Sequence, residues 1–221
     1  FVAQNADFVK LTQDILDLAV ANKCKTLDEV KALPMGNGTV QDAVVDRSGI
    51  TGEKMELDGY MTVEGVSTAV YNHMNRNGLC TIVAFNKNVD EQLAKQVAMQ
   101  IAAMNPQYLS SDDVSDEYKE REKAVLLAQA KNDPKNANKP DNIIEKMIIG
   151  RLNKELKEVC LTEQVYVKAE NKETVAKYVE SVAKAVGCNL TLKSFVRFET
   201  GEGLEKKEED FAAEVAAQMK G

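Results

Sequence analysis

The chain has 221 residues, enough to bury a sizeable core as one large domain or two smaller ones, and we expect a subdivided fold. Hydrophobic residues make up 44% and charged residues 29%, a globular composition that excludes a disordered chain. Asp and Glu number 35 against 28 Lys and Arg, so the net charge of -7 argues against a surface built to hold phosphate backbones and favours a protein partner over nucleic acid.

The four cysteines are widely spaced and include no C-x-x-C pair, which indicates neither a zinc site nor a disulfide framework. The sequence has no apolar run of the ~20 residues that a membrane span needs and no signal-peptide pattern. We therefore expect reduced thiols in a cytoplasmic protein. Because the chain begins with Phe1 rather than Met, we also expect a fragment whose N-terminal part is missing.

Three helices are expected near the start of the chain. Apolar residues recur at helical spacing from Phe8 to Ala19, which predicts one buried stripe on a polar helix. Thr26 and Glu29 have the spacing of a capping box and open a short second helix. Pro34 and the following glycines end it, and Thr39 can cap a third helix that runs through Val45.

Alternating residues over Met55–Val63 predict a strand, and Val66–His73 and Leu79–Phe85 are two more strand-like runs. The last two are joined by a segment with an Asn-Gly step, which favours a hairpin turn. A periodic helix from Asn88 to Met104 follows, and its apolar face is expected to cover the sheet.

Two charged helices, Ser115–Ala130 and Pro140–Val159, flank a polar turn and predict an antiparallel hairpin that projects from the body. The alternative is a pair of ordinary surface helices. The expected apolar seam consists of Tyr118, Val125 and Leu126 facing Ile144, Met147, Ile148 and Leu152.

A strand over Gln164–Lys168, a helix over Glu173–Val186 and a strand over Leu190–Phe198 complete the body. The expected fold is α+β, with two antiparallel-sheet-plus-helix subdomains, an inserted antiparallel helical hairpin and a C-terminal helix. The predicted division is 1–65 for the N-terminal core subdomain, 66–108 with 160–204 for the C-terminal core subdomain, 109–159 for the hairpin and 205–221 for the C-terminal module.

No catalytic, metal or cofactor site is expected. His73 is the one histidine, so sites that need several imidazoles are excluded and a catalytic triad would depend on it alone. The glycine pairs Gly36–Gly38 and Gly201–Gly203 match no phosphate-binding loop, and the carboxylates form solvated faces rather than lying in apolar stretches.

The C-terminal helix carries Phe211, Val215 and Met219 on one stripe beside several alanines, a flat face able to approach another helix closely. This stripe either packs on its own domain or forms a partner surface. Phe1, at the start of the chain, could likewise belong to a core.

Several motifs together resemble the elongation factor Ts family over the whole chain. Phe1–Ala3 is similar to the end of the family's Thr-Asp-Phe-Val-Ala signature. The other matching stretches are Gly52-Glu53, Ile101-Ala102-Ala103 with Pro106, Gly150-Arg151-Leu152, Leu161-Thr162-Glu163-Gln164, Val196-Arg197-Phe198-Glu199, Gly201-Glu202-Gly203 and Asp210-Phe211-Ala212-Ala213-Glu214-Val215-Ala216-Ala217.

The resemblance implies that the partner is the GTPase elongation factor Tu and that the function is guanine nucleotide exchange. It implies that Phe1, with Val2 beside it, enters the GTPase near its magnesium site and disturbs the ion and phosphate contacts. His73 would contact the GTPase domain, and Phe211 and Val215 would pack on the same domain. Thr51 stands where the family often has isoleucine, a departure at a partner contact.

Two other classes of function stay open from the sequence. A structural adaptor would use the hairpin as an arm, either toward the partner or toward a second copy of the chain, without affecting a nucleotide. A small-molecule enzyme would need a pocket with convergent polar groups. The resemblance also implies that the family begins with a small helical domain that binds the GTPase, so a chain lacking it should bind but accelerate GDP release less.

Overall fold

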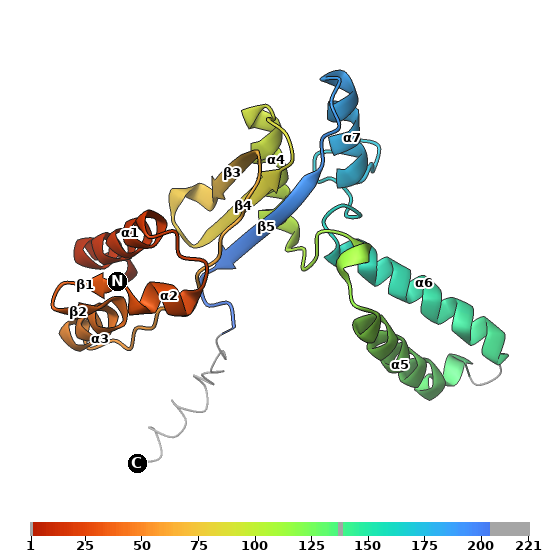
Figure 1. Ribbon diagram of the computed structural model, residues 1–221. Coiled ribbons are helices and arrows are strands. Elements are labelled where there is room, and N and C mark those ends of the chain that lie inside the picture. The colour runs from red at the N-terminus through yellow and green to blue at the C-terminus, as the bar shows by residue number, and fades with distance from the viewer. Residues whose placement is uncertain (1, 137–138, 204–221) are drawn as a thin grey trace, which may run out of the picture. The chain divides into compact units, whose positions relative to one another are not determined.

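The computed structural model describes residues 2–136 and 139–203, and it is drawn in Figure 1. The chain divides into two compact units, Phe1–Glu64 and Gly65–Gly221. Phe1 and the expected C-terminal helix, with Phe211 and Val215, lie outside the described residues. The α+β class is confirmed, whereas the finer division into subdomains, hairpin and C-terminal module stays a prediction.

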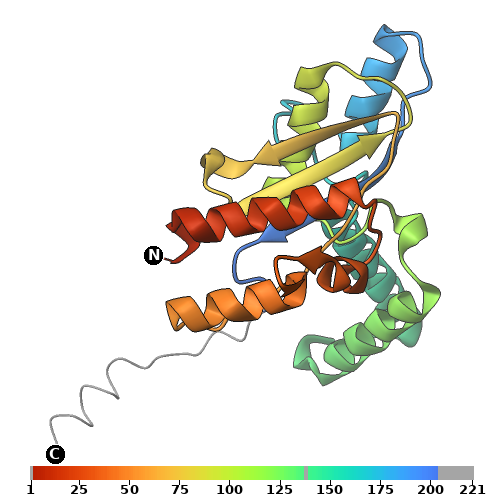
Figure 2. The same cartoon turned by 60° about the vertical axis from the view of Figure 1, so that its left-hand side comes forward.

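Helices dominate unit 1: a 3-10 turn η1 (Val2–Gln4), α1 (Ala6–Ala21), α2 (Leu27–Ala32) and α3 (Val40–Thr51), which Figure 2 shows together. Side chains cap all three α-helices, and α2 and α3 each begin with a complete capping box, so the backbone amides of their first turns are satisfied locally. The buried core of this unit consists of Ile15, Ala19, Cys24, Val30, Val40 and Val44.

Two sequence expectations for unit 1 need correction, and one is refined. The third helix does not end at Val45 but continues to Thr51, because Gly52 supplies the left-handed cap with φ 74°. The helix does break at Pro34 as expected, and the break contains two short antiparallel strands of two residues each, β1 (Pro34–Met35) and β2 (Gly38–Thr39). The strand expected over Met55–Val63 is wrong: the segment has no strand partner in the described part of the chain, and its half-buried apolar residues pack on the helices instead.

Unit 2 contains a three-stranded antiparallel sheet in the order β3 (Ser67–Asn72), β4 (Leu79–Phe85), β5 (Leu192–Glu199). Helix α4 (Glu91–Met104) packs on β3 and β4, and α7 (Val175–Ala185) adds to the same core. The fully buried members of that core are Val83, Phe85, Val97, Ala98, Ile101, Leu161 and Val175, all at most 1% exposed. The β3–β4 hairpin, α4 and β5 are therefore confirmed.

The strand expected over Gln164–Lys168 is wrong. Val165 forms a single bridge with Thr174, which is flanked by backbone hydrogen bonds from Tyr166 to Glu173 and from Val175 to Gln164. The Val165 carbonyl and the Val167 N–H bond to a side chain instead of to a second strand. Gln100 of α4, fully buried, accepts from the Val167 N–H at 2.9 Å and donates to the Val165 carbonyl at 3.1 Å. A side-chain amide thus takes the place of a neighbouring strand.

Both helices expected in the hairpin are present: α5 (Asp116–Asn132) and α6 (Asp141–Val159) run antiparallel and lie side by side in Figure 1. On α6 the buried stripe is Ile144, Ile148, Leu152 and Leu156, at intervals of four residues. It packs on Tyr118, Leu126, Leu127 and Ala130 of α5. The expected role of Val125 is wrong, because it lies one position off this stripe and is 43% exposed. Within the described ranges, none of the helices combines the length and apolarity needed to cross a membrane.

Candidate functional site

The connection between β3 and β4 presents the single histidine at the end of the sheet. His73 is exposed and begins a short 3-10 turn, η2 (His73–Asn75). A 2.9 Å hydrogen bond joins its Nδ1 to the Tyr71 hydroxyl. The two rings are tilted by 60° with centroids 5.9 Å apart. Because Tyr71 belongs to β3 and packs on the buried core, the imidazole is held on a rigid element rather than on a free loop.

The backbone of this connection is unusual. Met74, Asn75 and Asn77 all have φ between 54° and 55°, in the left-handed region that methionine rarely adopts. Asn72 stabilises the turn by accepting from the Asn77 N–H at 3.0 Å. The conformation directs Met74 outward, where it is 65% exposed. Strained, exposed apolar residues on a rigid support are typical of binding surfaces.

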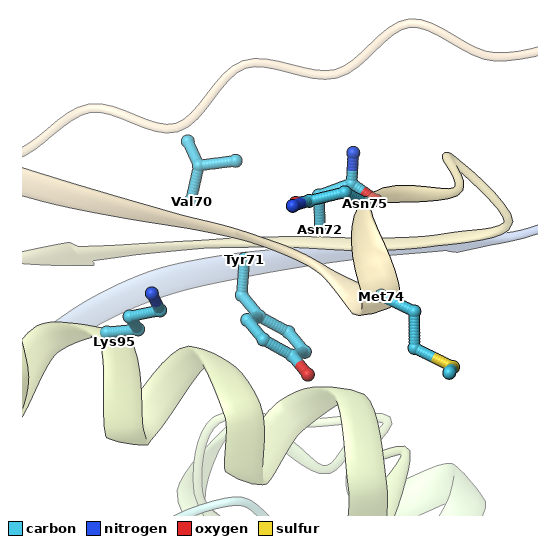
Figure 3. A pocket seen from close by; sticks show the side chains of 6 residues that line it. All are labelled: Val70, Tyr71, Asn72, Met74, Asn75 and Lys95. Atoms are coloured by element: carbon cyan, nitrogen blue, oxygen red, sulfur yellow. The ribbon is translucent and has the colours of Figure 1, made fainter.

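A hollow of about 390 Å³ lies beside this turn, lined by residues of β3, of the turn and of α4 (Figure 3). The Tyr71 ring points toward α4 on the side of the strand where Met74 lies, whereas Val70 and Asn72 point to the opposite side. Lys95 reaches the hollow from α4. The lining combines apolar groups, amides and one cation, a mixture suited to protein side chains.

Two other expected partner residues belong to unit 1. Val2, in η1, is half-buried, and Thr51 is half-buried at the end of α3. The Thr51 hydroxyl donates to the Arg47 carbonyl at 3.0 Å and accepts from the Glu53 N–H at 3.3 Å, so it is committed to its own helix end. An ion pair of 3.4 Å between Arg47 and Asp7 joins the end of α3 to the start of α1, so Val2 and Thr51 lie toward the same end of the unit.

The described residues offer little for chemistry. Among residues 2–136 and 139–203, no group of three or more His, Cys, Asp or Glu side chains could hold a metal ion. Burial raises the pKa of the Cys160 thiol to about 11 and also raises the pKa of Cys80, which keeps both thiols protonated and weakly nucleophilic.

Comparison with known proteins decides the family. The sequence model described as "Elongation factor TS" matches residues 1–202. The chain belongs to the elongation factor Ts family. It is 55% identical to "Elongation factor Ts" of Bacteroides thetaiotaomicron, with 90% of this chain and 74% of the relative covered. It is 40% identical to "Elongation factor Ts" of Spiroplasma citri, with 99% and 72% covered. Its role is therefore that of a translation elongation factor.

Sequence reasoning singled out His73 but missed the neighbouring Met74 and Lys95. The signal for Met74 was weak, because a left-handed methionine inside a turn has no sequence signature, and only the nearby Asn-Gly step marked the turn. Lys95 is an ordinary exposed residue of α4 until the fold places it beside β3. The contacts expected for Phe1, Val2, Thr51, His73, Phe211 and Val215 stay predictions for this elongation factor Ts family member.

Proposed function

We propose that this chain is a guanine nucleotide exchange factor that binds elongation factor Tu in its GDP state and promotes GDP release. The observation that carries the proposal is the family match over residues 1–202. The exposed His73 turn, which stands on the sheet beside the hollow, supports it with a surface suited to a protein partner. The net charge of -7 favours such a partner over direct contact with nucleic acid or with anionic lipid.

The mechanism is thermodynamic linkage. A factor that binds the nucleotide-free GTPase better than the GDP form must lower the GDP affinity by the same coupling free energy. Phe1, with Val2, would disturb the magnesium and phosphate site, and His73 with Thr51 would hold the GTPase domain while Phe211 and Val215 pack on it. No bond is made or broken, so this chain needs no cofactor or catalytic residue, and it would work in the cytoplasm with its GTPase.

The test is stopped-flow release of fluorescent GDP from purified elongation factor Tu. The chain should accelerate release, and His73→Ala should weaken this effect, since an anchor at an interface centre commonly contributes ~2 kcal/mol or more. Lys177→Ala, which removes an exposed cation on α7, is the matched control and should release GDP as the parent does. If the parent does not change the release rate, the exchange function is wrong.

The C-terminal residues are tested by binding. Phe211→Ala and Val215→Asp should each weaken association with elongation factor Tu, whereas circular dichroism should show an intact fold. Unchanged affinity would remove these residues from the proposed surface. Loss of fold would indicate that they pack on their own domain.

One observation favours a second function, that of a structural adaptor which uses the hairpin. Val125, Ile143 and Ile149 are 43%, 40% and 51% exposed on α5 and α6, so the arm carries apolar surface beyond its seam. If the chain is such an adaptor, for example as a homodimer formed through the hairpin, replacing Val125, Ile143 and Ile149 with serine should reduce the size of the assembly measured by sedimentation. GDP release would then be unaffected by the chain with or without the changes.

A further inference from the structure

The sequence contains the step Asn-Gly twice, at Asn37-Gly38 and at Asn77-Gly78. Each step lies at a hairpin turn, the first between β1 and β2 and the second between β3 and β4, and both asparagines are exposed. Because glycine has no side chain, its backbone nitrogen can approach the side-chain amide of the preceding asparagine and react with it. The two steps therefore share one chemistry and differ in the structure around them.

The second step has a backbone nitrogen that is not hydrogen-bonded. The Gly78 carbonyl accepts from the Thr200 N–H at 2.8 Å, but within residues 2–136 and 139–203 the Gly78 N–H has no acceptor. A backbone N–H without an acceptor can lose its proton and turn toward a neighbour at less cost than a bonded one, since no hydrogen bond has to be broken. Gly78 thus presents an available nucleophile beside the Asn77 side chain.

The side-chain amide of Asn77 is polarised by Asn72. Its Oδ1 accepts from Asn72 Nδ2 at 2.5 Å. The Asn77 N–H donates to Asn72 Oδ1 at 3.0 Å, so the pair of bonds fixes which end of the Asn72 amide faces Asn77. A donor at a carbonyl oxygen stabilises the negative charge that develops there when a nucleophile adds to the carbonyl carbon. Asn72 therefore makes the Asn77 amide a better electrophile.

The first step lacks both features. The Val40 N–H donates to the Leu33 carbonyl at 2.9 Å, and the register pairs Met35 with Gly38. Because hydrogen-bonded and non-bonded pairs alternate along an antiparallel ladder, Met35 and Gly38 form the next bonded pair, and the Gly38 N–H is held by the Met35 carbonyl. In the described part of the chain, no side chain donates to the amide oxygen of Asn37.

We infer that Asn77-Gly78 is a site of spontaneous deamidation, which changes the charge of the connection that presents His73. Hydroxide removes the Gly78 amide proton, the nitrogen bonds to Cγ of Asn77, and the Cγ–Nδ2 bond breaks as ammonia leaves with a proton from water. The five-membered succinimide then adds water. Breaking the ring bond from nitrogen to Cγ gives aspartate at position 77, and breaking the bond from nitrogen to the backbone carbonyl carbon gives isoaspartate. One water is consumed, one ammonia is released, and a neutral amide becomes a carboxylate.

The test compares both steps in one sample of the full chain, incubated in mildly alkaline buffer. Cleavage after lysine places Asn37 in the peptide 32–54 and Asn77 in the peptide 55–87, and mass spectrometry with fragmentation follows the conversion of each asparagine. Asn77 should convert at least about fivefold faster than Asn37, which is the effect of one hydrogen bond that must be broken at Gly38. The reaction needs no partner protein, so the test is independent of the proposed function.

Denaturation in guanidinium chloride is the first control, because it removes the structural difference and leaves the two Asn-Gly sequences. The two asparagines should then convert at similar rates. Asn72→Asp keeps an acceptor for the Asn77 N–H but has no N–H to donate to the Asn77 Oδ1, so it should slow conversion at Asn77. Asn75→Asp adds the same charge to the same turn and leaves both of these hydrogen bonds in place, so it should slow the reaction less.

Three results would each overturn the inference. The first is a rate at Asn37 that equals or exceeds the rate at Asn77 in the folded chain. The second is a difference between the two rates that survives denaturation, which would assign it to sequence rather than structure. The third is an equal rate at Asn77 in Asn72→Asp and Asn75→Asp, which would show that the Asn72 amide does not activate its neighbour.

Discussion

Replacement of Gln164 by leucine should destabilise unit 2 by about 3 kcal/mol, given a net ~1 kcal/mol for each hydrogen bond lost. Gln164 is 1% exposed and follows the base of the hairpin. Its Nε2 donates to the Met104 carbonyl at 3.2 Å and to the Glu158 carbonyl at 2.8 Å, so one amide joins the ends of α4 and α6. Its Oε1 accepts from Gln100 at 3.2 Å.

Leucine nearly matches the shape of glutamine, so the change isolates the polar contacts from the packing. Only Gln100 keeps an alternative partner, because its Nε2 also donates to the Val165 carbonyl. The matched control is Gln107→Leu, since Gln107 is exposed and its side chain bonds, within the described ranges, only to atoms of Asn105, two positions earlier. The control should change the free energy of unfolding by no more than ~0.5 kcal/mol.

Urea unfolding followed by tyrosine fluorescence is a suitable assay, because the chain has 6 tyrosines and no tryptophan. All of the tyrosines except Tyr60 belong to unit 2, so the signal reports mainly on that unit. If Gln164→Leu lowers the free energy of unfolding by less than ~1 kcal/mol, or by no more than the control does, the amide does not hold the ends of the two helices together.

Three further changes test packing, backbone space and capping. Leu152→Ala should destabilise the hairpin by ~2–5 kcal/mol in thermal unfolding, whereas Ile149→Ala, on the exposed side of α6, should cost far less; equal losses would contradict the seam. Gly65→Ala should prevent normal folding of unit 2, since the new Cβ would lie 2.6 Å from a β4 carbonyl oxygen. In Gly150→Ala the new Cβ would meet nothing within 4 Å, so this change should stabilise α6. The unfolding midpoint measures the effect of each variant. Hydrogen bonds from Thr39, the cap of α3, lower the pKa of Asp42, so this carboxylate stabilises the fold above its ordinary pKa of 3.8 and stops doing so as the pH falls through the lowered pKa. Asp42→Asn should remove this part of the acid dependence of the circular dichroism signal, and an unchanged acid profile would contradict the prediction.

The sequence predicted best the features that depend on nearby residues. The capping box at Thr26, the helix cap at Thr39, the β3–β4 hairpin and the apolar stripe of α4 all arise from local spacing, and all are confirmed. Met55–Val63 has the alternation of a strand, but a strand also needs a partner, and pairing is a property of the whole unit.

The site shows the same limit. His73 was singled out because it is the one histidine, a fact of composition. The left-handed Met74 and the burial of Arg197 under α4 follow from tertiary structure, as does the commitment of the Thr51 hydroxyl to its own helix end. Arginine in a strand normally predicts an exposed side chain, so its burial could be seen only once the sheet and helix were placed together.

The strand order of unit 2 has a consequence for how the protein folds. β3 and β4 are joined by a short turn, but β5 pairs with β4 only after about a hundred intervening residues, a separation that makes closure slow relative to local hairpin formation. During synthesis, β3, β4 and α4 can therefore assemble early, leaving one edge of β4 open until β5 emerges. Because Arg197 and Glu199 arrive with that last strand, the ion pair between them and the turn that follows can form only when the sheet is complete.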